Sequence, residues 1–219
     1  MKNDDTHITV ILDRTGSMEA IRDDTIGGFN AFLRQQKAEP GFATLTLVQF
    51  DSQDPYEVVH PFKALAAVPE LTRKTFVPRA STPLLDAMGR GINDLEKRLA
   101  DLREEARPAR VVMVIITDGQ ENASREFRKE QIQKMIQEKQ EKSDWQFVFL
   151  SADLAAIDDA LASGVHARSA MAFDKSSFGI AAVWGAASAR IADYRAARTS
   201  DVSFTEEDRA QQDREKQRK

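Results

Sequence analysis

The chain alternates along its length between short, continuous apolar runs and longer segments in which apolar residues recur at helical spacing. Two of the runs, residues 6–12 and 111–117, are rich in β-branched side chains. Runs of this kind are typical of strands that are covered on both faces. The pattern therefore predicts an α/β fold: a doubly wound, mostly parallel sheet with helices on both of its faces.

The predicted elements fill residues 6–199. Strands are expected at residues 6–12, 43–50, 56–59, 111–117, 145–150 and 167–173. Helices are expected at residues 18–37, 82–106, 125–141, 154–162 and 176–197. The gap between the second and third strands, around Asp54 and Pro55, is short enough for a hairpin. The third strand is therefore expected to be antiparallel and to lie at an edge.

The two ends of the chain differ from this central domain. Residues 1–5 form a polar leader without the apolar centre of a signal peptide. Residues 200–219 are expected to form a charged, mobile tail or a frayed helix, because the stretch EEDRAQQDREKQRK contains no aliphatic or aromatic residue beyond one alanine. Such a segment is expected to be a solvated end rather than a docking motif.

The composition excludes several classes of site and partner. The chain has no cysteine, which rules out disulfides, thiolate metal sites and a cysteine nucleophile. A net charge of -4 argues against general binding to nucleic acid. No apolar run approaches the roughly 20 residues that span a bilayer. We expect a cytoplasmic protein with no nucleic-acid or membrane partner, and the sequence leaves its oligomeric state open.

Three polar loops follow or precede the predicted elements in a way that favours one shared site. Asp13 follows the first strand directly, and Thr15 and Ser17 come next. Asp118 follows the central strand, and Thr82 stands just before a helix. Each residue alone suits an ordinary turn or helix cap. Ligands of such sheets bind at the carboxyl ends of the strands. Oxygen side chains there favour a hard divalent cation.

These residues resemble the metal-ion-dependent adhesion site of the von Willebrand factor A (vWA) domain, in its stand-alone bacterial form. That site follows the pattern D-x-S-x-S, then a threonine, then an aspartate. This chain has D-R-T-G-S from Asp13, S-T-P-L around Thr82 and I-T-D-G around Asp118. Thr15 stands where the family more often has serine, a change that keeps the oxygen. The resemblance implies a Rossmann-like vWA fold.

The resemblance also implies a role for each site residue. Thr15, Ser17 and Thr82 would touch Mg²⁺, or Mn²⁺ or Ca²⁺ in its place, while Asp13 and Asp118 would act mainly through water or by hydrogen-bonding the hydroxyls. Such a cation is only partly neutralised and keeps water-filled positions. An Asp or Glu carboxylate of a protein partner can replace one of those waters. The expected function is therefore a protein-interaction module rather than an enzyme. The family further implies that the helix at residues 176–197 shifts when the site is filled, but a static, packed helix is the more economical interpretation.

The main alternative is a Mg²⁺-dependent phosphohydrolase of the haloacid-dehalogenase type. Such enzymes also have an aspartate after the first strand, but they need a second acid two residues later, where this chain has Thr15. The acidic pair expected near a late strand is missing as well, since Gly119 follows Asp118. A nucleotide-binding switch is a third possibility, but the sequence has no G-x-x-x-x-G-K-[ST] loop.

Two further expectations concern residues outside the five proposed ligands. Arg14 lies inside the first loop and is expected to point toward solvent, where it would contribute to the choice of partner. The three histidines, His7, His60 and His166, are far apart in the chain and are expected to occupy surface or core positions rather than a catalytic site.

Overall fold

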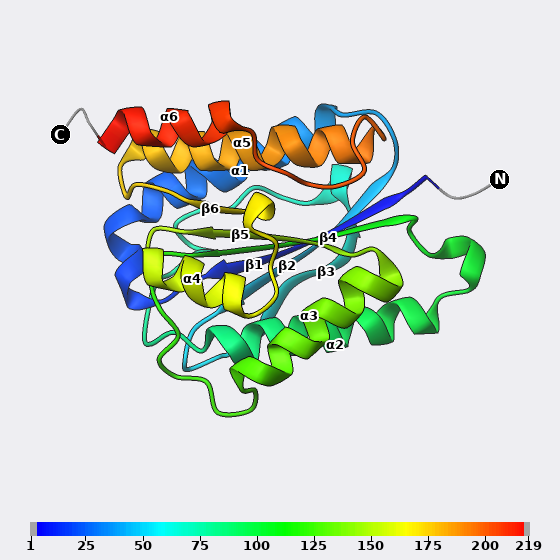
Figure 1. Cartoon of the computed structure of the whole chain (residues 1–219), viewed down its shortest axis with the longest axis horizontal. Helices are drawn as coiled ribbons and strands as arrows, with labels where there is room; N and C mark the ends of the chain where they lie inside the picture. The colour runs from blue at the N-terminus through cyan, green and yellow to red at the C-terminus, as the bar shows by residue number, and fades with distance from the viewer. Residues whose placement is uncertain (1–3, 217–219) are drawn as a thin grey trace.

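The computed structural model of the chain describes residues 4–216, in which a six-stranded sheet lies between two layers of helices (Figure 1). The strand order is β3-β2-β1-β4-β5-β6, and β3 alone runs antiparallel to its neighbour. The strands are β1 (Thr6–Asp13), β2 (Ala43–Phe50), β3 (Glu57–Ala64), β4 (Arg110–Thr117), β5 (Gln146–Ser151) and β6 (Ala170–Ala172). The predicted fold class, including the antiparallel edge strand, is confirmed.

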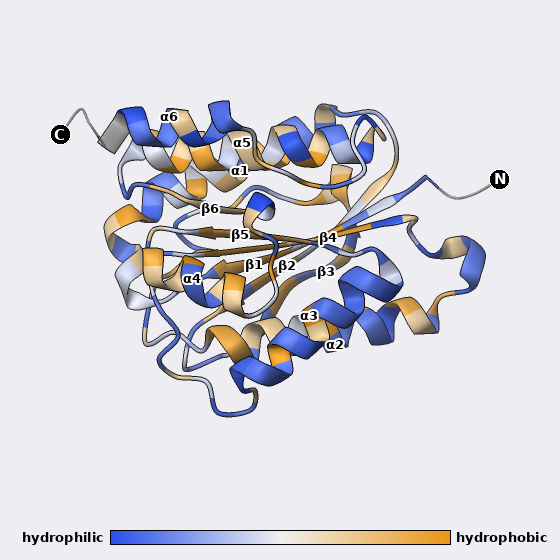
Figure 2. Ribbon diagram, in the orientation of Figure 1, coloured by the Kyte–Doolittle hydropathy of each residue, from blue (hydrophilic) through white to orange (hydrophobic). Residues whose placement is uncertain are grey.

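The helices divide between the two faces of the sheet (Figure 1). Helices α1 and α5 cover one face, α2, α3 and α4 cover the other, and α6 lies outside α5. Their bounds are α1 (Arg22–Ala38), α2 (Leu84–Asp101), α3 (Lys129–Ser143), α4 (Leu154–Ala162), α5 (Ser177–Arg195) and α6 (Glu206–Lys216). Figure 2 shows the strands as a largely hydrophobic centre, while hydrophilic and hydrophobic residues mix along the helices.

Alternate residues of the central strands serve two separate cores. On β1, Ile8, Val10 and Leu12 pack toward α1 and α5, whereas Ile11 packs toward α2. This period of two follows from the pleat of a strand. On the α1 side, Gly28 lets helix α5 come close, because a Cβ at this position would lie 2.1 Å from the ring of Trp184.

The sheet reverses its winding between β1 and β4, which are parallel neighbours with Leu12 opposite Ile116. The strands that follow β1 in the sequence, β2 and β3, lie toward one edge of the sheet. The strands that follow β4, namely β5 and β6, lie toward the other edge. A crevice opens at such a reversal, outside the carboxyl ends of the strands. Asp13 is the last residue of β1, and Asp118 comes directly after β4, so that both residues stand at this reversal.

Some element bounds differ from those predicted, for identifiable reasons. Strand β3 extends well beyond residues 56–59 and includes Pro61, which an edge strand tolerates because one side of its backbone has no partner strand. Helix α3 begins at Lys129 rather than at residue 125. The Asp86 carboxylate of α2 accepts the backbone N–H groups of residues 125–127 and holds them outside the helix.

The prediction of a solvated tail needs correction for residues 200–216. Val202 and Phe204 are buried in the core beside α5, and α6 packs along that helix. The side chain of Gln212 is also buried and donates to the Gly179 carbonyl at 2.8 Å, while Arg209 donates to the Ala170 carbonyl at 2.9 Å. Polar side chains that satisfy backbone carbonyls can dock a helix that has almost no apolar residues. Of the predicted leader and tail, residues 1–3 and 217–219 lie outside the described residues.

Within residues 4–216, none of the helices combines the length and the apolar character needed to cross a bilayer.

Candidate metal centre

Three loops meet beyond the carboxyl ends of β1 and β4. We name residues 14–17 loop 1, residues 79–83 loop 2 and residues 118–124 loop 3. Loop 1 is joined to loop 2 by a hydrogen bond from the Gly16 N–H to the Ala80 carbonyl, 3.0 Å long. Loop 2 is joined to loop 3 through Thr82 and Asn122, with the Thr82 N–H on the Asn122 side chain at 2.8 Å and the Asn122 N–H on the Thr82 carbonyl at 3.0 Å.

Four of the five predicted ligands form a continuous set of oxygens. The Ser17 hydroxyl donates to the Asp118 carboxylate at 2.5 Å and lies 3.3 Å from the Thr15 hydroxyl. The backbone N–H of Thr15 donates to the Asp13 carboxylate at 2.7 Å. The hydroxyl of Thr117, which the sequence analysis did not single out, donates to the other oxygen of Asp13 at 2.6 Å.

Asp13 is fully buried, and the groups that hydrogen-bond it are neutral. Burial raises the pKa of this carboxyl to about 6, and the nearby Asp118 carboxylate acts in the same direction, while the hydrogen bonds from Thr117 and Thr15 lower it. At neutral pH the group is therefore mostly ionised in surroundings that disfavour its charge. A divalent cation close by would remove that penalty.

Thr82, the fifth predicted ligand, is buried in loop 2 between the other two loops. Within residues 4–216, its hydroxyl has no hydrogen-bond partner, although its backbone is fixed to Asn122 at both the N–H and the carbonyl. The structure thus holds the Thr82 backbone against loop 3 and leaves its side-chain oxygen available as a ligand.

The donor chemistry of this centre fits a hard cation. Mg²⁺ and Mn²⁺ take oxygen ligands at roughly 2.1 Å in octahedral geometry, so that adjacent ligand oxygens lie about 3 Å apart. The 3.3 Å between the hydroxyls of Thr15 and Ser17, two of the proposed direct ligands, is close to that value. Among residues 4–216, no group of three or more histidine, cysteine or acidic side chains could hold a metal, so this centre depends on hydroxyls.

No protein-family model and no curated protein matches the chain in sequence. Solved structures match it in fold. A von Willebrand factor type A structure from Catenulispora acidiphila aligns with a TM-score of 0.53 and 11% identity over 85% of this chain. The chain has a vWA-type fold.

Other solved structures share this vWA fold at similarly low identity. Manganese-loaded TRAP protein from Plasmodium vivax aligns with a TM-score of 0.55 and 15% identity, over 80% of this chain and 70% of that one. Proximal thread matrix protein 1 from the mussel byssus, with a zinc-occupied MIDAS motif, gives 0.56 and 13% over 84% of this chain. The chain spans 46% of the mussel protein and 42% of the Catenulispora protein.

Lys175 is a second residue at the centre, after Thr117, that was not predicted from the sequence. The Lys175 ammonium forms an ion pair with the Asp118 carboxylate at 2.8 Å, on the oxygen that Ser17 does not use. Lys175 stands in the turn between β6 and α5, and its side chain is about half exposed. No local motif around this residue marks it, because the contact arises from the topology of the sheet.

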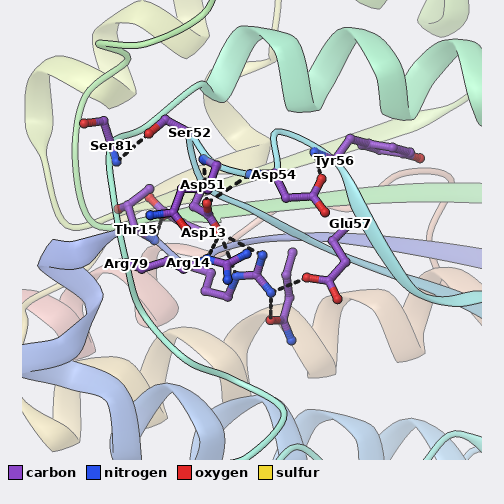
Figure 3. Close-up of polar contacts among 12 residues, drawn as sticks. Asp13, Arg14, Thr15, Asp51, Ser52, Asp54, Tyr56, Glu57, Arg79 and Ser81 are labelled. Atoms are coloured by element: carbon purple, nitrogen blue, oxygen red, sulfur yellow. Dashed lines mark hydrogen bonds and ion pairs between the residues drawn. The ribbon is translucent and has the colours of Figure 1, made fainter.

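Arg14 does not point toward solvent, as the sequence analysis expected. Its guanidinium is buried and pairs with Asp51, which follows β2, and with Glu57 on β3 (Figure 3). A buried guanidinium needs such partners because an uncompensated charge is costly in the interior. Asp51 was also missed, although it stands at the carboxyl end of a strand, as Asp13 does.

Proposed function

We propose that this chain binds one divalent cation at the carboxyl end of its sheet and through it captures an acidic side chain of a protein partner. The hydroxyls of Thr15, Ser17 and Thr82 would hold the cation directly, and Asp13 and Asp118 would act through water or by orienting the hydroxyls. Mg²⁺ is the expected ion, with Mn²⁺ or Ca²⁺ as substitutes. When bound, the cation supplies a positive centre with a water-filled position that a carboxylate can enter.

One observation carries the proposal. The Ser17 hydroxyl lies between the Thr15 hydroxyl and the Asp118 carboxylate, beside a buried Asp13 whose hydrogen-bonding partners are all neutral. This set offers oxygens at cation-ligand spacing but few anions in direct reach of an ion. A cation held there keeps much of its positive charge, which favours an external carboxylate. The metal-loaded TRAP and mussel structures, which share the fold, support the same assignment.

The geometry disfavours the phosphohydrolase alternative. A nucleophilic aspartate needs an oxygen that can reach a phosphorus atom. Both oxygens of Asp13 are engaged by Thr117 and Thr15, and the side chain is fully buried. We therefore propose no catalytic activity. The cytoplasmic location and the absence of a nucleic-acid partner stay predictions that rest on the sequence.

Calorimetric titration with Mn²⁺ and Mg²⁺ tests the cation site directly. We expect one ion per chain for the wild-type protein and no detectable binding for Asp118→Ala. The bound ion also raises the melting temperature, because a ligand that binds only the folded state stabilises it, by about 2.7 kcal/mol at a hundredfold excess over Kd. An unchanged melting temperature and a flat titration for the wild-type protein would contradict the proposal.

Water-proton relaxation of the Mn²⁺-loaded protein tests the second half of the proposal, the open position. Sodium acetate, a minimal carboxylate, should displace a bound water and lower the relaxation enhancement. Sodium chloride at the same ionic strength serves as the control and should leave it unchanged. If both salts act equally, the cation is bound but does not accept a carboxylate, and the interaction role is wrong. Turnover of a general phosphatase substrate that Asp13→Ala abolishes would favour the alternative.

A further inference from the structure

An ion-pair cluster around the buried Asp51 and Arg14 links loop 1 to the carboxyl end of β2 (Figure 3). One oxygen of the Asp51 carboxylate accepts from two guanidinium nitrogens of Arg14, at 2.7 and 3.0 Å, and from Arg79 at 2.9 Å. Its other oxygen accepts the backbone N–H groups of Gln53 and Asp54 at 2.8 and 3.1 Å. A single, fully buried carboxylate thus joins loop 1, loop 2 and the turn between β2 and β3.

The backbones of the same segments are also tied together. The N–H of Arg79 donates to the Arg14 carbonyl at 2.9 Å, and the N–H of Ser52 donates to the Ser81 carbonyl at 2.9 Å. Between these two bonds, Ala80 has a φ of 60°, a conformation that residues with a Cβ seldom adopt. Such a conformation persists when the surrounding contacts over-determine it. The hydrogen bonds to loop 1 and to the turn after β2 therefore hold loop 2 in an unfavourable backbone conformation.

The cluster also controls where positive charge lies. Arg14 follows Asp13 in sequence, yet its guanidinium is directed to Asp51 and Glu57 (Figure 3). Two arginines and two carboxylates balance in this cluster. Without Asp51, Arg14 and Arg79 would lose their shared partner, and an unbalanced guanidinium beside the centre would repel a cation.

We propose that Asp51 is a positioning residue of the metal centre. By holding Arg14 and Arg79 on one oxygen, it fixes loop 1 against loop 2 and so sets the placement of the Ser17 and Thr82 hydroxyls. Asp51 acts through the two arginines and does not touch the cation. This inference rests on the cation-binding function proposed above.

The decisive comparison is between Asp51→Asn and Asp54→Asn. Both changes remove one carboxylate from the same turn, but the Asp54 carboxylate accepts only the Tyr56 N–H and pairs with no arginine within residues 4–216. We expect Asp51→Asn to weaken Mn²⁺ binding roughly 10- to 100-fold, the range typical of residues that orient metal ligands. Asp54→Asn should stay within about twofold of wild type, because the Asp54 carboxylate holds neither Arg14 nor Arg79.

Two results would overturn the role of Asp51. One is a folded Asp51→Asn protein that binds Mn²⁺ within about twofold of wild type. The other is equal weakening by Asp54→Asn, which would make loss of charge, rather than positioning, the cause. If circular dichroism shows that Asp51→Asn does not fold, Arg79→Gln takes its place, because this side chain is 42% exposed and makes one bond to Asp51. We expect about tenfold weaker binding for that variant.

Hydrogen exchange of the metal-free protein separates a local role from general destabilisation. In Asp51→Asn, exchange should become faster at the amides of Gly16, Ser52 and Arg79 and stay unchanged in the central strands β1 and β4. A uniform increase across the whole sheet would overturn the proposal. If the wild-type protein itself binds no Mn²⁺, the proposed function fails, and the exchange data alone decide whether Asp51 holds the loops.

Discussion

The two ends of β1 each carry a fully buried titratable side chain, with opposite consequences. At the amino end, the His7 ring lies between the hydroxyls of Thr44 and Thr9, at 2.8 and 3.1 Å, and stacks on Phe62. Burial, helped by the charge of Arg98, lowers the pKa of His7 to about 3, so that the ring is neutral. At the carboxyl end, Asp13 is mostly ionised at neutral pH and has only neutral hydrogen-bonding partners.

The difference shows that burial of a polar group does not by itself mark a functional site. The neutral His7 ring is hydrogen-bonded to two neutral hydroxyls, and it needs no further partner from outside the protein. Both oxygens of the Asp13 carboxylate accept hydrogen bonds, but these neutral partners do not balance its negative charge. The fold therefore tolerates an unfavourable ionised group at the place where the cation is proposed to bind, and it avoids one at the other end of the same strand.

The largest effect is expected for Asp13→Asn, which removes the charge but keeps an oxygen for the Thr15 N–H. We expect Mn²⁺ affinity to fall at least about a thousandfold, since the cation loses a nearby anion. In EDTA at pH 7 the variant should nevertheless be more stable than wild type, by about 3 kcal/mol, because the pKa of Asp13 is raised from 3.8 to about 6 and one pKa unit corresponds to about 1.4 kcal/mol. Calorimetry and urea unfolding give the two quantities.

The size of this stability change depends on pH. The pKa of Asp13 in the folded state, about 6, lies above its ordinary value of 3.8, so its contribution to stability is full below pH 3.8 and is lost as the pH rises through 6. The advantage of Asp13→Asn should therefore shrink toward zero near pH 4. An equal or growing advantage at low pH would contradict the contrast between the two ends of β1.

A smaller effect on stability is expected from His7, at the amino end of β1. The pKa of His7 is lowered from 6.5 to about 3, so its contribution to stability is full above pH 6.5 and is lost as the pH falls toward 3. In the Asp13→Asn background, unfolding in EDTA should show a loss of about 2 kcal/mol between pH 7 and pH 5. Adding His7→Gln should remove this pH dependence. If it persists, another group is responsible.

The smallest effect is expected from Lys175→Gln, which removes a positive charge that already pairs with Asp118. Because that ammonium competes with a cation, we expect Mn²⁺ affinity to rise about three- to tenfold at low salt and less at high salt. Lys129→Gln, which breaks a surface ion pair with Asp159 in the same way, is the matched control and should leave affinity unchanged. Weaker Mn²⁺ binding in Lys175→Gln would mean that this lysine supports the centre.

The sequence predicts the fold well where apolar periodicity is strong. The central strands β1, β2 and β4 lie within a residue or so of their predicted bounds because their continuous apolar runs allow only buried strands. Strand β3 was predicted too short, since Pro61 and Lys63 interrupt its pattern. The docking of α6 depends on Gln212 and Arg209 reaching backbone carbonyls, which composition does not reveal.

The candidate centre was predicted only in part. Strand ends and hydroxyl spacing pointed to Asp13, Thr15, Ser17, Thr82 and Asp118, which three converging loops carry. The direction of Arg14 could not be predicted, because it depends on Asp51 and Glu57, which are more than thirty residues away in sequence. Lys175 reaches Asp118 from a turn 57 residues further along the chain. Contacts of this kind follow from sheet order, and short motifs do not contain them.

The docking of α6 changes what a movement of α5 would involve. Gln212 holds the Gly179 carbonyl in the first turn of α5, and Asp208 pairs with Arg190 further along the same helix, at 3.3 Å. Helix α6 is thus attached to α5 at two points along its length. If α5 shifts along its axis when a cation binds, we expect α6 to move with it, and a fluorescent label on the outer surface of α6 would then register the event.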